Sequence, residues 1–298
     1  MENFVDRETF GRLVAALRKE QFDYKKGRSW SQQELADRTG LTQRIVSKME
    51  VGKQARIDGL ILGNLADAFC LTSLERSEFF AMASEIGDGQ IVRSDLCDEE
   101  VFAQMWESLS NLHAPAMLVD SFGDVLGVNR SLTAFHNLRA IELQARTNSD
   151  AGVNILSMLL ADEGLRQVLG NGWRRIALAC MRQWRVTTLR HRHTHRYERL
   201  FESLSALPDF RTLWVAVGDS EELFYDSVHL RSSTYRHAVH GLVAYSVFTS
   251  IGICSCGEFY LSVFVPQDFA TATLFQELGS QNKGPLPLMP WPTGFARQ

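Results

Sequence analysis

The chain has 298 residues, of which 45% are hydrophobic and 22% charged, the composition of a folded globular protein with enough length for two domains. Its formal net charge of −4 excludes a protein that coats nucleic acid with its whole surface, but it leaves room for a local basic face. The five cysteines are dispersed in a chain that needs no disulfide bonds, and the sequence starts without a signal-peptide pattern, so we expect a cytoplasmic protein.

Residues 1–87 repeat the apolar pattern of amphipathic helices. Phe10, Leu13, Val14 and Leu17 follow the spacing i, i+3, i+4, i+7, and the same spacing recurs further along. A capping-box pattern, threonine at position 72 and glutamate at position 75, starts the last helix of this region. We therefore predict an all-α domain over 1–87, followed by a linker or connecting helix over 88–110.

The stretch WSQQELADRTGLTQRIVSKMEVGK predicts two helices that cross steeply. Ala36 supplies a small residue at the crossing, and Gly40 supplies the positive φ that a tight turn requires. Val46 and Met49 supply apolar side chains that face the first helix, while Thr42 is placed to cap the second. Together these features predict a helix-turn-helix.

With Val46 and Met49 facing inward, the second helix exposes side chains that bind bases and phosphates in a major groove, namely Gln43, Arg44, Ser47 and Lys48. Residues 18–56 contain ten Lys or Arg and five Asp or Glu, hence +5 in a chain of −4. A local basic region of this kind favours a DNA-binding module. The alternative is an ordinary helical hairpin with a solvated polar face.

The same segment resembles the Cro/C1-type, or XRE-type, helix-turn-helix of phage repressors, through SQQELA, the glycine turn, TQ at the start of the recognition helix, and EVGK. The resemblance implies that Gln32 holds a phosphate and that Thr42, Gln43, Arg44 and Lys48 face the groove, and we expect Lys53 to contact the DNA backbone. The proline common after this exit is absent, and Ala55-Arg56-Ile57 stands there instead, which puts the following loop in doubt.

Residues 111–280 have a mixed α and β texture. A strand over 116–119, a tight turn, a second strand over 124–128 and a helix over 130–136 capped by Asn129 are typical of the opening of a PAS-like sensor fold. Residues 154–207 are helical in pattern. Strands return between 223 and 265, before a helix over 268–278 and a proline-rich, irregular tail over 281–298. The uncharged run over 241–257 alternates every second residue, which predicts strands rather than a membrane helix.

Further along, NILSMLL at 154–160, Trp173, and PDFRTLW at 208–214 resemble patterns of the MmyB-like ligand-binding domain, although Pro208 stands where that family often has serine. In that family the domain follows an XRE-type DNA-binding domain in bacterial regulators. The expected fold class is therefore an all-α N-terminal helix-turn-helix domain plus an α/β (α+β) PAS-like C-terminal domain with an antiparallel sheet.

A PAS-like fold implies a cavity between the sheet and the helices that binds a small hydrophobic ligand, for example a fatty acid. We expect no other cofactor. The residues predicted to line this cavity are Leu118, Leu132, Phe135, Leu156, Leu159, Tyr245, Val247 and Phe248, with the alternate face of the last strand left open. The alternative is that these side chains simply fill the core.

The tract RHRHTHR, residues 190–196, interleaves three histidines with four arginines. Four arginines repel a dication, so metal binding is disfavoured, and direct DNA contact is disfavoured because the tract lies outside the basic module. We expect a solvated, basic entrance to a helix over 197–207. A second hypothesis makes the tract a charged lip that meets the anionic head group of an apolar ligand.

These patterns predict a sequence-specific, ligand-responsive transcription regulator that binds a double-stranded DNA operator as a homodimer, since two half-sites multiply affinity and specificity. We expect no enzyme activity, no catalytic or metal-binding residues, and no membrane partner. One alternative is a C-terminal domain that binds protein, or dimerises, without a small ligand. Another is an enzyme fused to a DNA-targeting domain.

Overall fold

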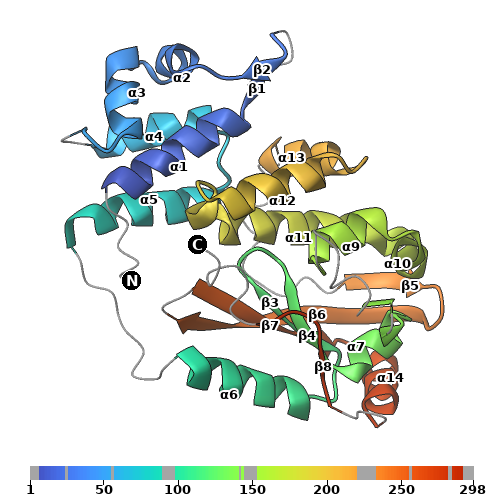
Figure 1. The fold of residues 1–298 in the computed structure, drawn as a ribbon. Helices are drawn as coiled ribbons and strands as arrows, with labels where there is room; N and C mark the ends of the chain where they lie inside the picture. Colours follow the sequence, from blue (N-terminus) through green and yellow to red (C-terminus); the bar gives the residue numbers. More distant parts are fainter. Residues whose placement is uncertain are drawn as a thin grey trace. The chain divides into compact units, whose positions relative to one another are not determined.

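The computed structural model describes residues 7–23, 26–54, 57–88, 98–140, 142–143, 153–219, 233–254, 257–280 and 284–290. The chain divides into two compact units, shown in Figure 1 and described separately below. The first comprises Met1–Arg93, Arg185–Phe201 and Val215–Ser220; the second comprises Ser94–Trp184, Glu202–Trp214 and Glu221–Gln298. Two segments inside the predicted 111–280 domain therefore fold with the first unit.

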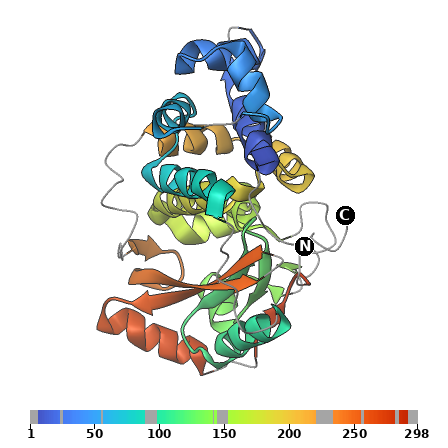
Figure 2. The same cartoon turned by 90° about the vertical axis from the view of Figure 1, so that its left-hand side faces the viewer.

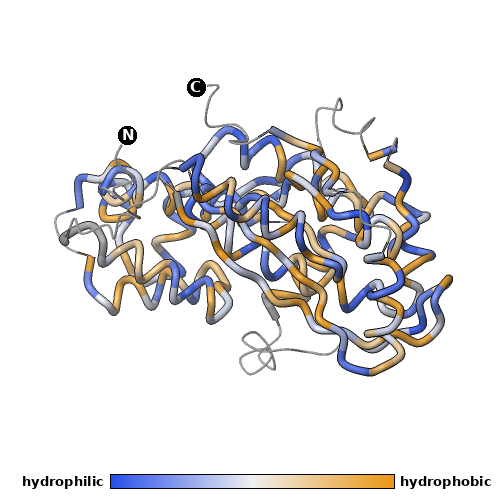
Figure 3. The backbone as a smooth tube through the Cα atoms, turned by 90° about the horizontal axis from the view of Figure 1, so that it is seen from below, coloured by the Kyte–Doolittle hydropathy of each residue, from blue (hydrophilic) through white to orange (hydrophobic). Residues whose placement is uncertain are grey.

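The first unit is helical, as predicted. Its N-terminal part contains α1 (Arg7–Glu20), α2 (Gln32–Thr39), α3 (Gln43–Glu50), α4 (Gly59–Ala68) and α5 (Ser73–Asp88), with a short hairpin, β1 (Phe22–Asp23) and β2 (Arg28–Ser29). The later segments add the end of α11 (Trp173–Thr187), η2 (Leu189–His191), the start of α12 (His195–Ser205) and the end of α13 (Phe210–Asp219). Hydrophobic and hydrophilic residues alternate along the backbone of the chain (Figure 3), a pattern that amphipathic helices require.

The core of the first unit forms on the predicted helix faces. Phe10, Leu13, Val14 and Leu17 of α1 are fully buried, together with apolar residues of α2 to α5. Leu189 of η2 belongs to the same apolar cluster. A residue more than a hundred positions away in sequence thus completes the core of the N-terminal helices.

Local hydrogen bonds explain where α2 and α3 begin and end. Ser31 and Glu34 form a reciprocal capping box at the start of α2, and Gly40, at φ +69°, ends that helix in the left-handed conformation. The Thr42 side chain accepts a hydrogen bond from the backbone N–H of Ile45 and so caps α3. The predicted roles of Gly40 and Thr42 are confirmed.

The second unit is built on an antiparallel sheet, in agreement with the predicted α+β class. The strands are β3 (Ala116–Asp120), β4 (Val125–Val128), β5 (Ser233–His237), β6 (Gly241–Cys254), β7 (Gly257–Pro266) and β8 (Leu286–Pro287), in the order β5-β6-β7-β3-β4-β8. The helices are α6 (Asp98–Asn111), α7 (Arg130–Phe135), α9 (Ile155–Ala161), α10 (Glu163–Leu169), η1 (Gly170–Gly172), most of α11, parts of α12 and α13, and α14 (Phe269–Gly279). Figure 2 shows α6 and α14 beside the sheet.

The two faces of the sheet carry different packing. Phe259 and Leu261 of β7 pack with Leu118 of β3 in an apolar cluster that also includes side chains of α6. Because side chains alternate along a strand, Phe264 of β7 points to the opposite face, where it contacts Phe135 of α7 at a ring-centroid distance of 6.2 Å. The sheet therefore separates an α6 core from an aromatic cluster.

The C-terminal half departs from the prediction in two respects. The uncharged run 241–257 forms strand, as expected, but β6 continues as one strand over most of it. The proline-rich tail, predicted to be irregular, contributes β8, which pairs with β4. Within the described ranges, no helix combines the length and hydropathy needed to cross a membrane.

Close packing of α1 against the end of α3 generates a test. A Cβ added at Gly11 would lie 2.3 Å from the Met49 carbonyl oxygen and 2.8 Å from that of Glu50. We expect Gly11→Ala to lower the free energy of unfolding of the first unit by about 1 to 3 kcal/mol, because backbone cannot move aside as a flexible side chain can. Urea denaturation measures the loss.

Gly63→Ala in α4 is the matched control, because nothing lies within 4 Å of the added Cβ there. Alanine is the better helix former, so this variant should gain about 0.5 to 1 kcal/mol. Equal effects of the two substitutions would show that Gly11 has no special role in α1 packing.

Candidate functional site

The outer face of α3 presents the polar side chains that the sequence predicted. Gln43, Arg44 and Lys48 are exposed, whereas Val46 and Met49 on the opposite face are buried. Thr42 and Lys53 are also exposed at the two ends, and Ser47 is half-buried. Among the described residues, none makes an ion pair with Arg44, Lys48 or Lys53, so these cations remain available to phosphates.

Gln32 takes part in a different interaction from the one predicted. Its Nε2 donates a hydrogen bond of 2.8 Å to Oε2 of Glu50, so the amide is used within the first unit. Glu50 also receives a bidentate interaction from Arg18, whose Nε lies 2.6 Å from Oε1. Arg18 additionally donates to the Trp30 carbonyl oxygen at 2.5 Å. These bonds tie the start of α2 and the end of α3 to α1, which fixes the orientation of the recognition helix.

Part of the basic charge of this region is neutralised within the unit. Lys26 and Arg28 of the hairpin both pair with Glu34, and the Arg38 guanidinium stacks over the Trp30 ring at 4.1 Å. The net charge of +5 already counts Glu34, so these contacts leave the net charge unchanged but make Lys26, Arg28 and Arg38 less available to DNA. The unpaired cations named above lie on or just after α3, where they would meet a major groove.

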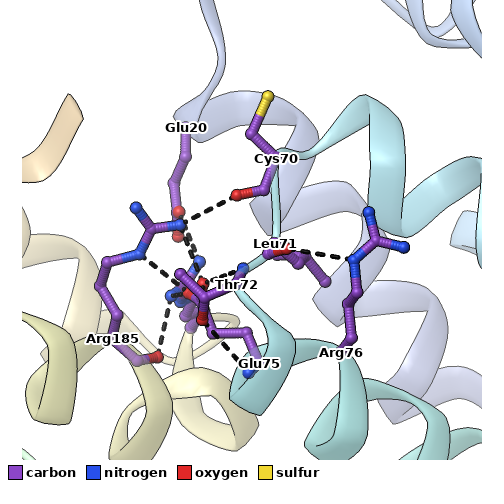
Figure 4. A network of polar contacts seen from close by, with 8 residues as sticks. Glu20, Cys70, Leu71, Thr72, Glu75, Arg76 and Arg185 are labelled. Atoms are coloured by element: carbon purple, nitrogen blue, oxygen red, sulfur yellow. Dashed lines mark hydrogen bonds and ion pairs between the residues drawn. The ribbon is translucent and has the colours of Figure 1, made fainter. Parts of the chain in front are cut away.

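A buried cluster of charges also lies in the first unit (Figure 4). Arg185 makes a bidentate pair with Glu75, through Nε to Oε1 at 3.0 Å and Nη2 to Oε2 at 2.9 Å. Arg192 bridges two carboxylates, with Nη2 2.6 Å from Glu75 and Nη1 3.0 Å from Glu20. The Thr72 backbone N–H donates to the Glu75 carboxylate and the Glu75 backbone N–H donates to the Thr72 hydroxyl, as the predicted capping box requires, and the hydroxyl itself also donates to that carboxylate. We call Glu20, Glu75, Arg185 and Arg192 the buried charge cluster.

The positive and negative charges of the cluster offset one another inside the protein, where burial shields them from solvent. Burial by itself raises the pKa of Glu75, but the guanidinium groups of Arg192 and Arg185 outweigh burial and lower the pKa to about 2. Burial raises the pKa of Glu20, against the opposing effect of Arg192. The side chains of Glu75, Arg185 and Arg192 are at most 5% exposed, so two cations face two carboxyl groups in a site where an unpaired charge would be strongly destabilising.

The tract RHRHTHR is not the solvated helix entrance that we predicted. Arg192 belongs to the buried charge cluster, and Arg190 pairs with Glu78 of α5. Burial, followed by the nearby charges of His193 and Arg190, lowers the pKa of His191 to about 4. Of the three histidines, only His195 has an exposed side chain. The tract folds within the first unit, and the hypothesis of a charged lip on a ligand pocket stays a prediction.

The eight residues predicted to line one ligand cavity do not share one site. Leu118 lies in the α6 core, whereas Phe135 and Tyr245 lie in the aromatic cluster on the opposite face of the sheet. Val247 and Phe248 are 43% and 47% exposed. The remaining three, Leu132 on α7 and Leu156 and Leu159 on α9, are buried. The predicted residues therefore lie on both faces of the sheet. Val247 and Phe248 are too exposed to line an enclosed site.

The aromatic cluster also contains three histidine side chains that no sequence pattern brings together. His136 follows α7, while His237 and His240 flank the turn between β5 and β6. All three rings contact Phe135, with centroid distances of 4.7, 5.0 and 5.8 Å respectively. His136 is about a hundred residues from His237 and His240 in sequence, so no local pattern predicts that the three rings lie together. Only the short spacing of His237 and His240 could have indicated that two of them are neighbours. Among the described residues, no group suited to hold a metal ion is found.

Comparison with protein families places both units. A model described as "MmyB-like transcription regulator ligand binding domain" matches residues 99–278, more than half of the chain. A second model, described as "Helix-turn-helix", matches residues 23–73 and includes α2 and α3. A search of curated proteins gave no match. Arg185 and Arg192 lie inside the first matched region, although they fold with the elements of the second.

The buried charge cluster predicts a large effect of Glu75→Gln at neutral pH. The substitution leaves two buried guanidinium groups without their shared carboxylate, and we expect the first unit to lose about 3 to 5 kcal/mol of its free energy of unfolding. The lowered pKa of Glu75 stabilises the folded state fully above the ordinary glutamate pKa of 4.5, and this contribution is lost as the pH falls toward about 2. The raised pKa of Glu20 has the opposite effect, because its contribution to stability is present at low pH and is lost as the pH rises. Urea titration followed by amide hydrogen exchange in α5 measures the effect.

Glu198→Gln is the control, because its side chain on α12 is 56% exposed and pairs only loosely with His195, at 3.8 Å. It should change stability by less than about 0.5 kcal/mol. A Glu75→Gln penalty that persists unchanged at pH 2 would contradict the proposed charge balance.

Proposed function

The chain belongs to the family defined by the MmyB-like transcription regulator ligand binding domain, and on this basis we propose that it is a ligand-responsive regulator that binds a specific double-stranded DNA operator as a homodimer. The two family matches identify a DNA-binding transcription regulator with a ligand-binding domain. The matches point to a regulator rather than to an enzyme. The operator, the ligand and the dimer are the parts that we propose.

The observation that supports specific DNA binding is the outer face of α3. Gln43 and Arg44 occupy its first turn, where the recognition helix of a helix-turn-helix contacts base edges. Arginine pairs in bidentate fashion with guanine and glutamine with adenine, so these two side chains are the proposed base readers. Lys48 and Lys53 are proposed to contact phosphates, which carry no sequence information.

The way such modules bind DNA supports the proposed homodimer. One recognition helix reads few base pairs, and two copies on half-sites about 34 Å apart multiply both affinity and specificity. The second unit offers a surface for the second copy: Val247, Ile251 and Ile253, which alternate onto one face of β6, are 43% to 61% exposed. Exposed apolar side chains gathered on one strand are typical of an interface. This surface also favours the alternative function, in which the C-terminal unit acts by dimerisation without a small ligand.

We propose that the ligand is a small hydrophobic molecule, of which a fatty acid is one example, and that the second unit acts as a PAS-like sensor. Support comes from the family match and from the aromatic cluster around Phe135. The proposed route to DNA is the segment Arg185–Phe201, which enters the first unit directly after Trp184. Trp184 is held in the second unit by a 2.7 Å hydrogen bond from Nε1 to the Phe122 carbonyl oxygen. A change that moves Trp184 would therefore act on Arg185 through one peptide bond.

Arg44→Ala tests the proposed recognition. On an operator selected from random sequence, the variant should lose about 1 to 3 kcal/mol of binding free energy and tolerate substitution at the base pair that Arg44 contacts. Lys53→Ala, which removes a phosphate contact, should weaken selected and random DNA alike and reduce the salt dependence of binding. Fluorescence anisotropy with both duplexes at two salt concentrations gives these values. If Arg44→Ala weakens both duplexes equally, Arg44 is not a base reader.

A further inference from the structure

The second half of β6 has a free edge. β5 pairs with β6 only at residues 241–245, whereas β7 pairs with it on the other side as far as Cys254 (Figure 1). In the part of the chain that the structure describes, no strand pairs with the outer edge of residues 247–254. Such an edge offers backbone N–H and C=O groups to a further strand.

The contacts of Ala244 establish which backbone groups point to this edge. The Gln267 N–H donates to the Ala244 carbonyl oxygen at 2.8 Å, which continues the β6–β7 ladder by one residue, so Ala244 directs its backbone groups toward β7. The direction alternates along an antiparallel strand, and the odd-numbered residues therefore point to the free edge. In agreement, Tyr245 lies opposite Pro266, which has no N–H to donate. The residues that point outward are Val247, Thr249, Ile251 and Ile253.

The side chains along the free edge are uncharged and exposed. The exposed fractions of Val247, Phe248, Ile251 and Ile253 are 43%, 47%, 57% and 61%. Residues 241–257 contain no charged residue and no proline, and the register with β7 is continuous from Tyr245 to Cys254. Charges, prolines and bulges are the usual features that keep a free edge from pairing. This edge of β6 is thus regular, apolar and suited to another strand.

We propose that this edge pairs antiparallel with the same edge of a second copy of the chain, about a two-fold axis at Ser250, so that the two sheets join. In this register Val247 pairs with the partner's Ile253, and Thr249 pairs with the partner's Ile251. Ser250 lies directly opposite the partner's Ser250. The proposal rests on the proposed homodimer and assigns its interface and register.

The positions of the outward-facing groups favour a second copy as the occupant. They are symmetric about Ser250, so a copy related by a two-fold axis there provides a backbone partner for each of them. A shift of the axis to Thr249 would leave Ile253 opposite the partner's Tyr245, which β5 already covers. Backbone hydrogen bonds of this kind supply the affinity of strand addition.

The side chains fit the same register. Val247 and the partner's Ile253 would form apolar cross-strand pairs on one face of the joined sheet. On the opposite face Phe248 would lie beside the partner's Gly252, where no side chain opposes the ring. Because the segment carries no charge, pairing with itself brings no like charges together.

Exchange of charge at Ser250 tests the interface in the full chain, because this residue would face its own copy. Two lysines or two glutamates there would repel each other, so Ser250→Lys and Ser250→Glu should each weaken the dimer by at least about tenfold. An equimolar mixture of the two variants should form a heterodimer. Sedimentation equilibrium without DNA measures both effects. Ser203→Lys, at an exposed serine of α12 in the second unit, should dimerise like wild type.

Cross-linking through Ser250→Cys supplies a second readout. Residues opposite each other in a pair without mutual hydrogen bonds have Cα atoms about 4.5 Å apart, a separation that a disulfide can bridge. Oxidation by copper phenanthroline should therefore link Ser250→Cys into covalent dimers. Phe248→Cys is the matched control, because its two copies would lie about 13 Å apart along the strands, and it should stay unlinked like wild type.

Three results would overturn the proposal. They are a wild-type chain that stays monomeric at its highest soluble concentration, a dimer that Ser250→Lys leaves intact, and a monomer that Ser250→Lys destabilises toward urea. The last result would mean that another segment of the same chain covers the edge.

A duplex with a single half-site separates this interface from the DNA-binding function. One copy of the chain suffices to bind it, so wild type and Ser250→Lys should bind it equally. Failure of wild type to bind any selected half-site would contradict the proposed operator binding, whereas the measurements without DNA would still decide the interface.

Discussion

The carboxylate of Glu75 is the interaction on which the first unit depends. It is fully buried and accepts hydrogen bonds from both Arg185 and Arg192 as well as from Thr72 at the start of its own helix. Arg192 then extends the chain of charges to Glu20, the last residue of α1. Since each buried guanidinium requires a carboxylate, α1, α5 and the Arg185–Phe201 segment hold one another in a single arrangement.

The position of the recognition helix follows from this arrangement through α1. One end of α1 carries Glu20, which pairs with Arg192, and two residues earlier Arg18 pairs with Glu50 at the end of α3. Gly11 lets the backbone of α3 approach the middle of the same helix. The outer side chains of α3, which we propose contact DNA, are thus positioned by contacts that α3 makes with α1. A displacement of Arg192 would move α1 through Glu20, and α1 would then move α3 through the pair of Arg18 and Glu50.

Sequence patterns were sufficient where the cause is local. Gly40, Thr42 and the Thr72–Glu75 capping box each act within a few residues, and the apolar faces of α1 and α3 repeat within one helix. Patterns failed where burial depends on distant partners. No sequence pattern near Arg192 indicates that Glu20 and Glu75 surround it. No pattern near His136 indicates that its ring lies beside that of His237. Along β6 the alternation of Val243 and Tyr245 continues to Val247, but β5 pairs only with residues 241–245, and Val247 is exposed.

The membership of Arg185–Phe201 in the first unit has a consequence for biosynthesis. The ribosome releases Met1–Arg93 before the 91 residues that separate Arg93 from Arg185, an interval of roughly 5 to 20 s at ordinary elongation rates. During that interval Glu20 and Glu75 have no guanidinium partners and Leu189 is absent from the core. The first unit therefore lacks these partners until residues 94–184 of the second unit have been synthesised, which couples completion of the unit that carries the helix-turn-helix to production of the ligand-binding domain.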